Sequence, residues 1–139
     1  MKYMLIMRDT DAAVEAAENV DFEKIIREMG EYNEQLIRAG VLLGGDGLAP
    51  DIETTGFVVD FSTTPPAVTD GPYGETHELF NGFWIIEVSS KAEAVEWASR
   101  APLGEGTKLE VRRITDESDH AAFAEDQHDR AAAILAADG

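Results

Sequence analysis

The chain has 139 residues, 44% of them hydrophobic, and its 28 acidic and 11 basic residues give a formal net charge of −17. This length and composition predict one domain with a sizeable core rather than a disordered chain, and the absence of cysteine excludes disulfides and thiolate metal sites. The acidic composition offers no basic patch, and no apolar run approaches the roughly 20 residues that span a bilayer. We therefore expect a cytoplasmic protein that binds neither nucleic acid nor membranes.

The first half of the chain predicts three strands and one helix. An apolar run at Lys2–Arg8 is typical of a strand. Apolar residues then recur at helical spacing from Asp21, which we interpret as an N-cap, to Gly40, which stops the helix. Further strands are predicted at Val41–Leu48, whose glycines indicate a bulge or a close backbone approach, and at Thr55–Phe61, where apolar residues alternate.

The second half contains the strongest predicted strand, at Asn81–Val88, which is apolar on both faces. Ser90 and Glu93 match a capping box and begin a helix that ends before Pro102. The other predicted elements are a short extended piece at residues 67–69, a strand at 107–114 and an acidic terminal helix at 116–139.

The order of these elements predicts an α+β fold with the split βαβ arrangement of a ferredoxin-like sheet. We divide the chain into a domain at residues 1–115 and an acidic C-terminal helical extension at 116–139. Two helices cover only one face of a sheet, yet the predicted strands are apolar on both faces. We therefore expect a homodimer in which two sheets pack face to face. In the alternative monomer, the terminal helix folds across the open face.

Candidate chemistry gathers in residues 70–81, which we name the DGP segment. Its polar side chains are Asp70, Tyr73, Glu75, Thr76, His77, Glu78 and Asn81. A carboxylate beside an imidazole fixes the tautomer of the ring and raises its basicity, as general acid–base chemistry requires. No second histidine is spaced to complete a metal site, and the glycines at 44–47 lack the lysine and serine of a phosphate loop. We expect neither a metal nor a cofactor.

The DGP segment also carries a family resemblance. Asp70-Gly71-Pro72-Tyr73, Glu75-Thr76-His77-Glu78 and Gly82-Phe83 resemble the motif of DGPF-domain proteins in the YCII-related superfamily, and the likeness spans about residues 1–114. The resemblance implies a dimeric α/β barrel with a cavity at the sheet interface, bordered by the DGP segment. Some relatives lie beside or are fused to sigma factors, and others resemble dehydrochlorinases that use a histidine–aspartate pair.

This sequence departs from the family pattern at three places. The helix that carries the histidine in the dehydrochlorinase-like relatives has Glu31, Tyr32 and Asn33 here, so the pair does not transfer. Tyr73 replaces the usual phenylalanine and adds a hydroxyl group. His77 replaces the usual lysine, which exchanges a permanent cation for a group that titrates near neutrality.

The first functional hypothesis is a lyase or isomerase that transfers protons on a small organic molecule. His77 acts as the base, Asp70 or Glu75 orients it, and Tyr73 donates a hydrogen bond. The ligand-binding residues are Phe83, Ile85 and Glu78, with Met4 or Ile6 adding to an apolar wall.

The second hypothesis is a non-catalytic dimeric module that senses a small ligand or binds another protein, with a link to sigma-factor regulation. In that case Asp70 is structural, because its carboxylate accepts hydrogen bonds from the backbone of the Gly71-Pro72 turn. A third hypothesis is an interaction protein that uses the apolar stripe from Phe123 to Leu135 in the terminal helix.

Overall fold

The computed structural model describes residues 1–18, 20–72, 78–119 and 129–136. Its elements, in chain order, are β1 (Lys2–Thr10), α1 (Asp11–Ala17), α2 (Phe22–Arg38), β2 (Leu42–Gly47), α3 (Ile52–Thr55), β3 (Phe57–Asp60), β4 (Ala67–Asp70), β5 (Glu78–Glu87), α4 (Lys91–Ser99) and β6 (Lys108–Arg113). Residues 129–136 are also helical.

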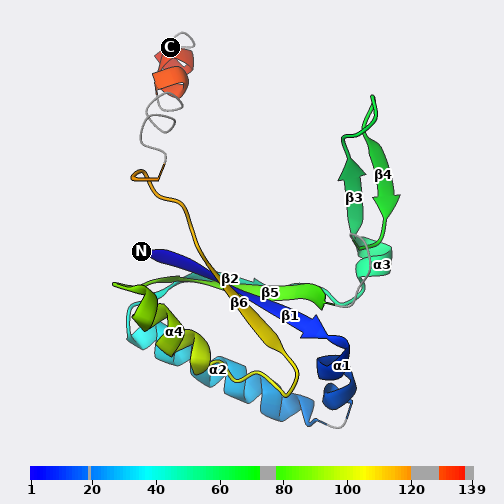
Figure 1. Cartoon of the computed structure of the whole chain (residues 1–139), viewed down its shortest axis with the longest axis vertical. Helices are drawn as coiled ribbons and strands as arrows, with labels where there is room; N and C mark the ends of the chain where they lie inside the picture. Colours follow the sequence, from blue (N-terminus) through cyan, green and yellow to red (C-terminus); the bar gives the residue numbers. More distant parts are fainter. Residues whose placement is uncertain (19, 73–77, 120–128, 137–139) are drawn as a thin grey trace.

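Four strands form one antiparallel sheet in the order β2-β5-β1-β6. Leu5 in the central strand β1 lies opposite Trp84 of β5 and Val111 of β6. The helices α2 and α4 lie on one face of this sheet (Figure 1). The predicted α+β class is confirmed, and the described residues of the single chain form no closed barrel.

The core lies between the sheet, the second half of α2 and α4. Its buried residues are Tyr3, Leu5, Tyr32, Leu36, Val41, Trp84, Ile86, Val88 and Ala94. The Tyr32 and Trp84 rings meet edge to face at 5.3 Å, and the Tyr32 hydroxyl donates a 2.7 Å hydrogen bond to the Trp97 carbonyl. Burial raises the pKa of Tyr32 to about 12. The Trp84 indole donates to the Asn33 side chain at 2.8 Å, so the polar groups of both rings are paired.

The predicted helix ends agree with the structure, with one change. The Asp21 carboxylate accepts from the Glu23 amide at 3.0 Å at the start of α2. Ser90 caps α4 as predicted, because its hydroxyl accepts from the Glu93 amide. The Glu93 carboxylate reaches back to the Ser89 amide rather than to that of Ser90, which moves the second half of the capping box by one residue. Hydrogen bonds from the Ser89 hydroxyl and from the Ser89 amide lower the pKa of the Glu93 carboxyl group.

Two short helices were not predicted. Thr10 caps α1 by accepting from the Ala13 amide at 3.1 Å, whereas the sequence was interpreted there only as the end of a strand. The helix α3 occupies residues 52–55, so the predicted strand at 55–61 is shortened to β3 at 57–60.

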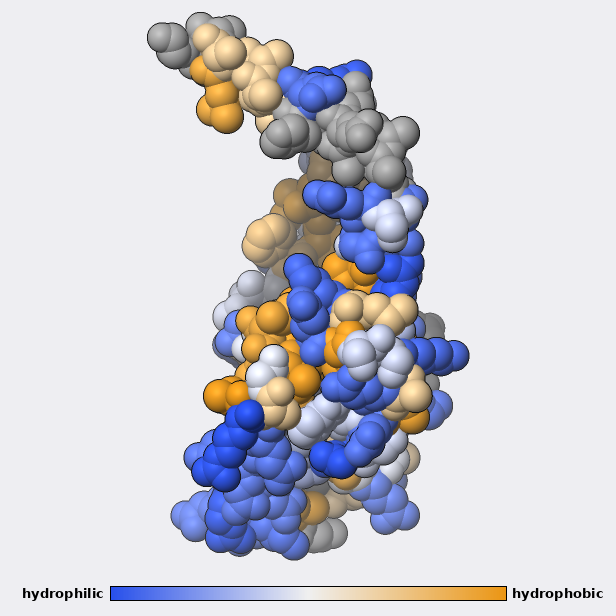
Figure 2. Space-filling model, turned by 90° about the vertical axis from the view of Figure 1, so that its left-hand side faces the viewer, coloured by the Kyte–Doolittle hydropathy of each residue, from blue (hydrophilic) through white to orange (hydrophobic). Residues whose placement is uncertain are grey.

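The face of the sheet away from α2 and α4 is apolar at its centre, and we name it the open face. Met4 lies opposite Ile85, and Ile6 lies opposite Phe83, on the side of the strands that alternates with the buried Trp84. Figure 2 shows apolar surface gathered at the level of the sheet on one side of the molecule. The predicted apolar character of both strand faces is therefore confirmed.

The strands β3 and β4 form a separate two-stranded sheet that rises on the side of the open face (Figure 1). Phe57, Phe61 and Val68 on this hairpin are 64%, 79% and 64% exposed. An isolated two-stranded hairpin is marginally stable in water, and exposed aromatic rings add a further cost. This hairpin therefore presents a surface suited to contact with another chain.

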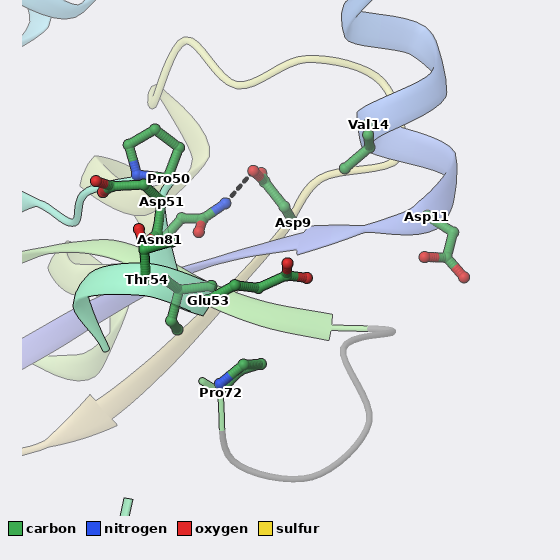
Figure 3. Close-up of a pocket in the computed structure, with 10 residues that line it drawn as sticks. Asp9, Asp11, Val14, Pro50, Asp51, Glu53, Thr54, Pro72 and Asn81 are labelled. Atoms are coloured by element: carbon green, nitrogen blue, oxygen red, sulfur yellow. Dashed lines mark hydrogen bonds between the residues drawn. The ribbon is translucent and has the colours of Figure 1, made fainter. Parts of the chain in front are cut away.

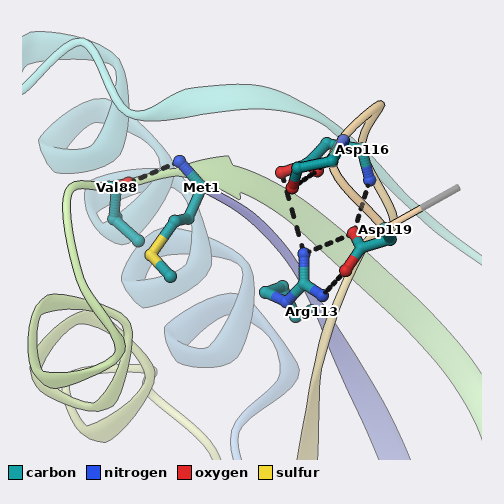
Figure 4. Close-up of polar contacts among 6 residues, drawn as sticks. Met1, Val88, Arg113, Asp116 and Asp119 are labelled. Atoms are coloured by element: carbon teal, nitrogen blue, oxygen red, sulfur yellow. Dashed lines mark hydrogen bonds and ion pairs between the residues drawn. The ribbon is translucent and has the colours of Figure 1, made fainter. Parts of the chain in front are cut away.

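Polar contacts hold the N-terminus and the segment that follows β6 against the sheet (Figure 4). The amino group of Met1 donates to the Val88 carbonyl at 2.9 Å. After β6, the Arg113 guanidinium forms a two-point contact with the Asp119 carboxylate and holds its pKa well below the usual range. The predicted terminal helix does not begin at Asp116, because residues 117–119 form a turn, and the part of the prediction at 120–128 lies outside the described residues.

Candidate functional site

The predicted catalytic residues divide between described and undescribed parts of the chain. Tyr73, Glu75 and His77 lie outside the described residues, so their roles stay predictions. Asp70 is exposed at the end of β4, where it pairs with Phe57.

The motif glycine Gly71 follows at a φ of 103°, a backbone conformation that favours glycine. Its amide donates to the Gly56 carbonyl at 2.9 Å and closes the base of the β3–β4 hairpin.

The predicted ligand-binding residues lie on the main sheet. Phe83 and Ile85 pair with β1 on the open face, and the Phe83 ring lies 6.3 Å from that of Phe80. The backbone of Glu78 pairs with that of Thr10 at the start of β5. The predicted acid Asp70 is thus on the hairpin, whereas the predicted apolar wall is on the four-stranded sheet.

A cleft lies where the DGP segment meets the end of the sheet, and we name it the acidic cleft. Its volume is about 470 Å³, and Figure 3 shows residues that line it. The lining residues are Asp9, Asp11, Val14, Pro50, Asp51, Ile52, Glu53, Thr54, Pro72 and Asn81. Pro72 belongs to the DGP motif, so the motif borders a cavity.

Two helix N-termini bring acidic residues to this cleft. Asp11 is the first residue of α1, and the Thr10 side chain fixes that turn by accepting from Ala13 and donating to the Gly106 carbonyl at 2.6 Å. Asp51 precedes α3, and Glu53 lies in its first turn. Carboxylates are favourable near helix N-termini, which explains their concentration at this end of the fold.

A bulge in β5 directs Asn81 toward the same cleft. Met7 pairs with Gly82 and Arg8 pairs with Phe80, so Asn81 has no partner in β1. The register of β5 relative to β1 shifts by one residue at this position. The Asn81 side-chain amide donates to the Asp9 carboxylate (Figure 3). This bond holds Asp9 in place in the cleft.

The lining of the acidic cleft combines carboxylates with apolar walls. Its lining includes four carboxylates, and no lysine or arginine belongs to it among the described residues. Val14, Pro50, Ile52 and Pro72 supply apolar surface beside them. No group of three or more His, Cys, Asp or Glu side chains in the described part of the chain is arranged to hold a metal ion. The arrangement fits an organic ammonium group with an attached carbon skeleton.

The sequence interpretation missed Asp9, Asp11, Asp51 and Glu53 because they lie in two stretches of chain that are about 40 residues apart in the sequence. A signal for the first two was present, since Thr10 followed by Asp11 and alanines is typical of a capped helix. The position of Asp51 and Glu53 depends on how the β2–β3 connection folds back onto the sheet, which no local pattern reveals.

A family model for the YCII-related domain matches residues 1–118 of this sequence. The chain belongs to the YCII-related family. It is also 26% identical over 98 residues to an uncharacterised protein of Rhizobium meliloti (strain 1021), an alignment that covers 70% of this chain and 77% of that protein. All residues of the acidic cleft lie within the YCII-related match. None of the described helices has the length and apolar character needed to cross a membrane.

Proposed function

We propose that this YCII-related protein binds a small organic cation in the acidic cleft. The observation that carries the proposal is the set of four carboxylates around a cleft of about 470 Å³ whose remaining walls are largely apolar. A cleft of this size and mixed lining suits a small organic ligand, and the negative charge selects against organic acids. Asn81 keeps the Asp9 carboxylate oriented as an acceptor for an ammonium N–H group.

Thermal denaturation with a matched pair of probes tests this proposal. Benzylamine should raise the melting temperature of the wild-type protein, whereas benzoate, which has the same ring and the opposite charge, should not. The double variant Asp51→Asn/Glu53→Gln should lose the response to benzylamine. Glu31→Gln, which removes one exposed carboxylate from the middle of α2, should retain it. Equal responses in the double variant and in Glu31→Gln would place the amine elsewhere, and no response to any amine would refute the proposal.

Acid–base catalysis on the bound molecule is the finer form of this proposal. His77 is the base, oriented by Asp70 or Glu75, and Tyr73 is a donor. The support is that the DGP segment borders the acidic cleft through Pro72. Once an amine that binds is identified, its conversion should be measured in wild type and in His77→Ala. Turnover that is unchanged in His77→Ala would exclude the histidine as the base.

The fold proposal is a ferredoxin-like domain at residues 1–115, with a C-terminal extension at 116–139, that pairs with a second copy to form a dimeric α/β barrel. The antiparallel order β2-β5-β1-β6 supports the ferredoxin-like arrangement. The exposed side chains of Ile134 and Leu135, 63% and 72% accessible, and the position of their helix in Figure 1 argue against a terminal helix that covers the open face.

The dimer is tested by a charge on the open face. Ile85→Glu should convert the dimer to a monomer, because it places a carboxylate in an apolar contact between sheets. Val95→Glu changes an exposed residue of α4, on the other side of the sheet, and should leave the dimer intact. Sedimentation velocity measures both masses. A monomeric wild-type protein, or a dimer that tolerates Ile85→Glu, would contradict this assembly.

One observation favours the non-catalytic alternative for Asp70. Gly71 adopts its positive φ and bonds to Gly56 at the base of the hairpin, which is the geometry of a structural turn. In a binding module that senses a ligand or contacts another protein, Asp70→Asn should lower the melting temperature while the response to benzylamine persists.

A further inference from the structure

A second and larger cavity lies behind the sheet, on the side of the helices. The end of β1, the helix α1, the first half of α2 and the connection between α4 and β6 border a partly open space of about 650 Å³. We name this space the helix-side cavity. Its lining residues are Met7, Asp9, Ala13, Val14, Ala16, Val20, Lys24, Ile25, Glu28, Met29, Pro102, Leu103, Gly104, Glu105 and Thr107. Figure 1 shows these four segments meeting below the same end of the sheet.

The cavity is apolar inside. Met7 from the sheet, Ile25 and Met29 from α2, and Leu103 from the connection supply carbon and sulfur surface. Each of these residues is only partly buried, although each faces the layer in which the core forms. Partly buried apolar side chains around a space of this size are typical of a small-molecule site.

The charges in the lining define what the cavity accepts. Asp9, Glu28 and Glu105 oppose a single cation, Lys24, whose ammonium group is 3.9 Å from the Glu28 carboxylate. Lys24 is paired with Glu28, Asn81 donates a hydrogen bond to Asp9, and Glu105 is exposed to solvent. No described charge in the lining is therefore placed to compensate a charged ligand in the apolar interior, where such a ligand would lose its hydration. The lining therefore favours an uncharged molecule.

The far wall of the cavity is adaptable. Met7 and Met29 also line a neighbouring hollow of about 390 Å³ beneath β2, so the two side chains lie between the two spaces. A Cβ atom on Gly82 would lie 3.1 Å from the Met7 methyl group, so glycine gives this side chain room. Methionine is flexible and polarizable, which lets such a wall adjust to ligands of different length.

We propose that the helix-side cavity is a binding site for a small uncharged organic molecule of one or two rings, distinct from the amine site in the acidic cleft. The two spaces share Asp9 and Val14 in their linings but open among different elements. The ligand fills the space between α1 and α2 and contacts the Met7 and Met29 methyl groups.

Methionine methyl NMR tests the proposal on the full chain. The sequence has four methionines, and the signals of Met7 and Met29 report on the cavity, whereas Met4 reports on the open face and Met1 on the chain end. Naphthalenemethanol is the uncharged probe, and naphthoate is its anionic match. The alcohol should shift the Met7 and Met29 signals saturably and leave those of Met1 and Met4 in place, whereas naphthoate should bind about tenfold more weakly or not at all.

Adjacent isoleucines provide a matched pair of variants. Ile25 lines the cavity, and Ile26 is 56% exposed on the outside of α2. Ile25→Trp should fill the space and lower the affinity for naphthalenemethanol by about tenfold or more. Ile26→Trp should leave that affinity unchanged. Leu103→Trp fills the space from the other side and replaces Ile25→Trp if that variant does not fold. The double variant Asp51→Asn/Glu53→Gln should keep full affinity for the alcohol, which separates this site from the amine site.

Four results would overturn the proposal. The first is the absence of a saturable Met7 or Met29 shift in the wild-type protein. The second is equal weakening by the tryptophan variants at 25 and 26, and the third is naphthoate binding as tight as that of the alcohol. Shifts confined to Met4 would place the probe on the open face and would also refute the assignment.

Discussion

The two ends of the layer between the sheet and its helices differ in packing, although the same helix α2 and the same strands β1 and β5 form both. At the α4 end, Leu36 and Ile86 are 0% exposed, and Tyr32 and Trp84 lock together edge to face. At the α1 end, Ile25 and Met29 are only partly buried and face a cavity. Both buried residues of α2 lie in its second half. Stability is thus concentrated at one end of the layer, and space for a ligand at the other.

Side-chain volume explains the difference. The packed end has two large rings that fill the gap between α2 and the sheet, each with a paired polar group. At the other end the same gap faces Gly82, Ala13 and Ala16, which are too small to fill it, and methionines, which fill it without fixing one arrangement. The small residues that α1 and β5 place opposite α2 therefore leave space at one end of the layer, whereas the Tyr32 and Trp84 rings fill it at the other.

The largest expected effect is the loss of a core side chain at the packed end. Leu36→Ala should lower the free energy of unfolding by about 2 to 5 kcal/mol, because the surrounding side chains cannot close the space. Ile25→Ala, the corresponding change at the hollow end, should cost about 1 kcal/mol or less, because it enlarges a cavity that already exists. Urea denaturation measures both. Similar losses at the two positions would show that the layer is uniformly packed.

A smaller effect is expected from the hydroxyl group of Tyr32. Tyr32→Phe should lower the free energy of unfolding by about 1 kcal/mol, because the Trp97 carbonyl loses its donor. The folded pKa of about 12 exceeds the unfolded value of 10.0, so the unfolded state releases this proton first as the pH rises. Wild-type stability should therefore fall between these two pH values.

That alkaline decrease should be smaller in Tyr32→Phe when denaturation is followed as a function of pH. The difference between the two proteins in the pH dependence of the unfolding free energy gives the contribution of Tyr32 alone, because other groups that titrate at high pH are the same in both. An identical slope in both would mean that Tyr32 is accessible to water in the folded state.

The smallest expected effect is a gain in stability from the middle of α2. Gly30 lies inside the helix with open space where a Cβ atom would be, so Gly30→Ala should raise the free energy of unfolding by about 1 kcal/mol or less. The control is Gly45→Ala, whose Cβ would lie 2.6 Å from the Phe83 carbonyl oxygen and should destabilise the protein. Thermal denaturation distinguishes the signs. Destabilisation by Gly30→Ala would indicate that the first half of α2 is not a regular helix in solution.

Local signals predicted much of the packed end. Asp21 and Gly40 marked the ends of α2, and Ser90 marked the start of α4, because caps and stops act within one turn of helix. The alternation of Trp84 and Ile85 correctly placed them on opposite faces of the sheet. These features depend on residues that are neighbours in the sequence, so they can be predicted from the sequence alone.

The hollow end and the acidic cleft were not predicted, because they depend on long-range contacts. Asp9 meets Asn81 only through the register of β1 and β5, and Glu53 approaches them through the fold of the β2–β3 connection. A cavity results from volume that side chains leave unfilled, and periodicity in the sequence does not report volume. The proposed roles of Tyr73, Glu75 and His77 stay predictions from the sequence, because these residues lie outside the described part of the chain.

The bulge at Asn81 has a consequence for how this domain tolerates change. Residues from Gly82 onward keep the pairing that builds the core, whereas the shift in register is absorbed at one position before them. Insertions or deletions in the preceding segment therefore need not change the register in which β5 pairs with β1 and β2. The DGP segment can vary in length and composition on a constant scaffold, a modularity that would let one fold exchange its ligands without being rebuilt.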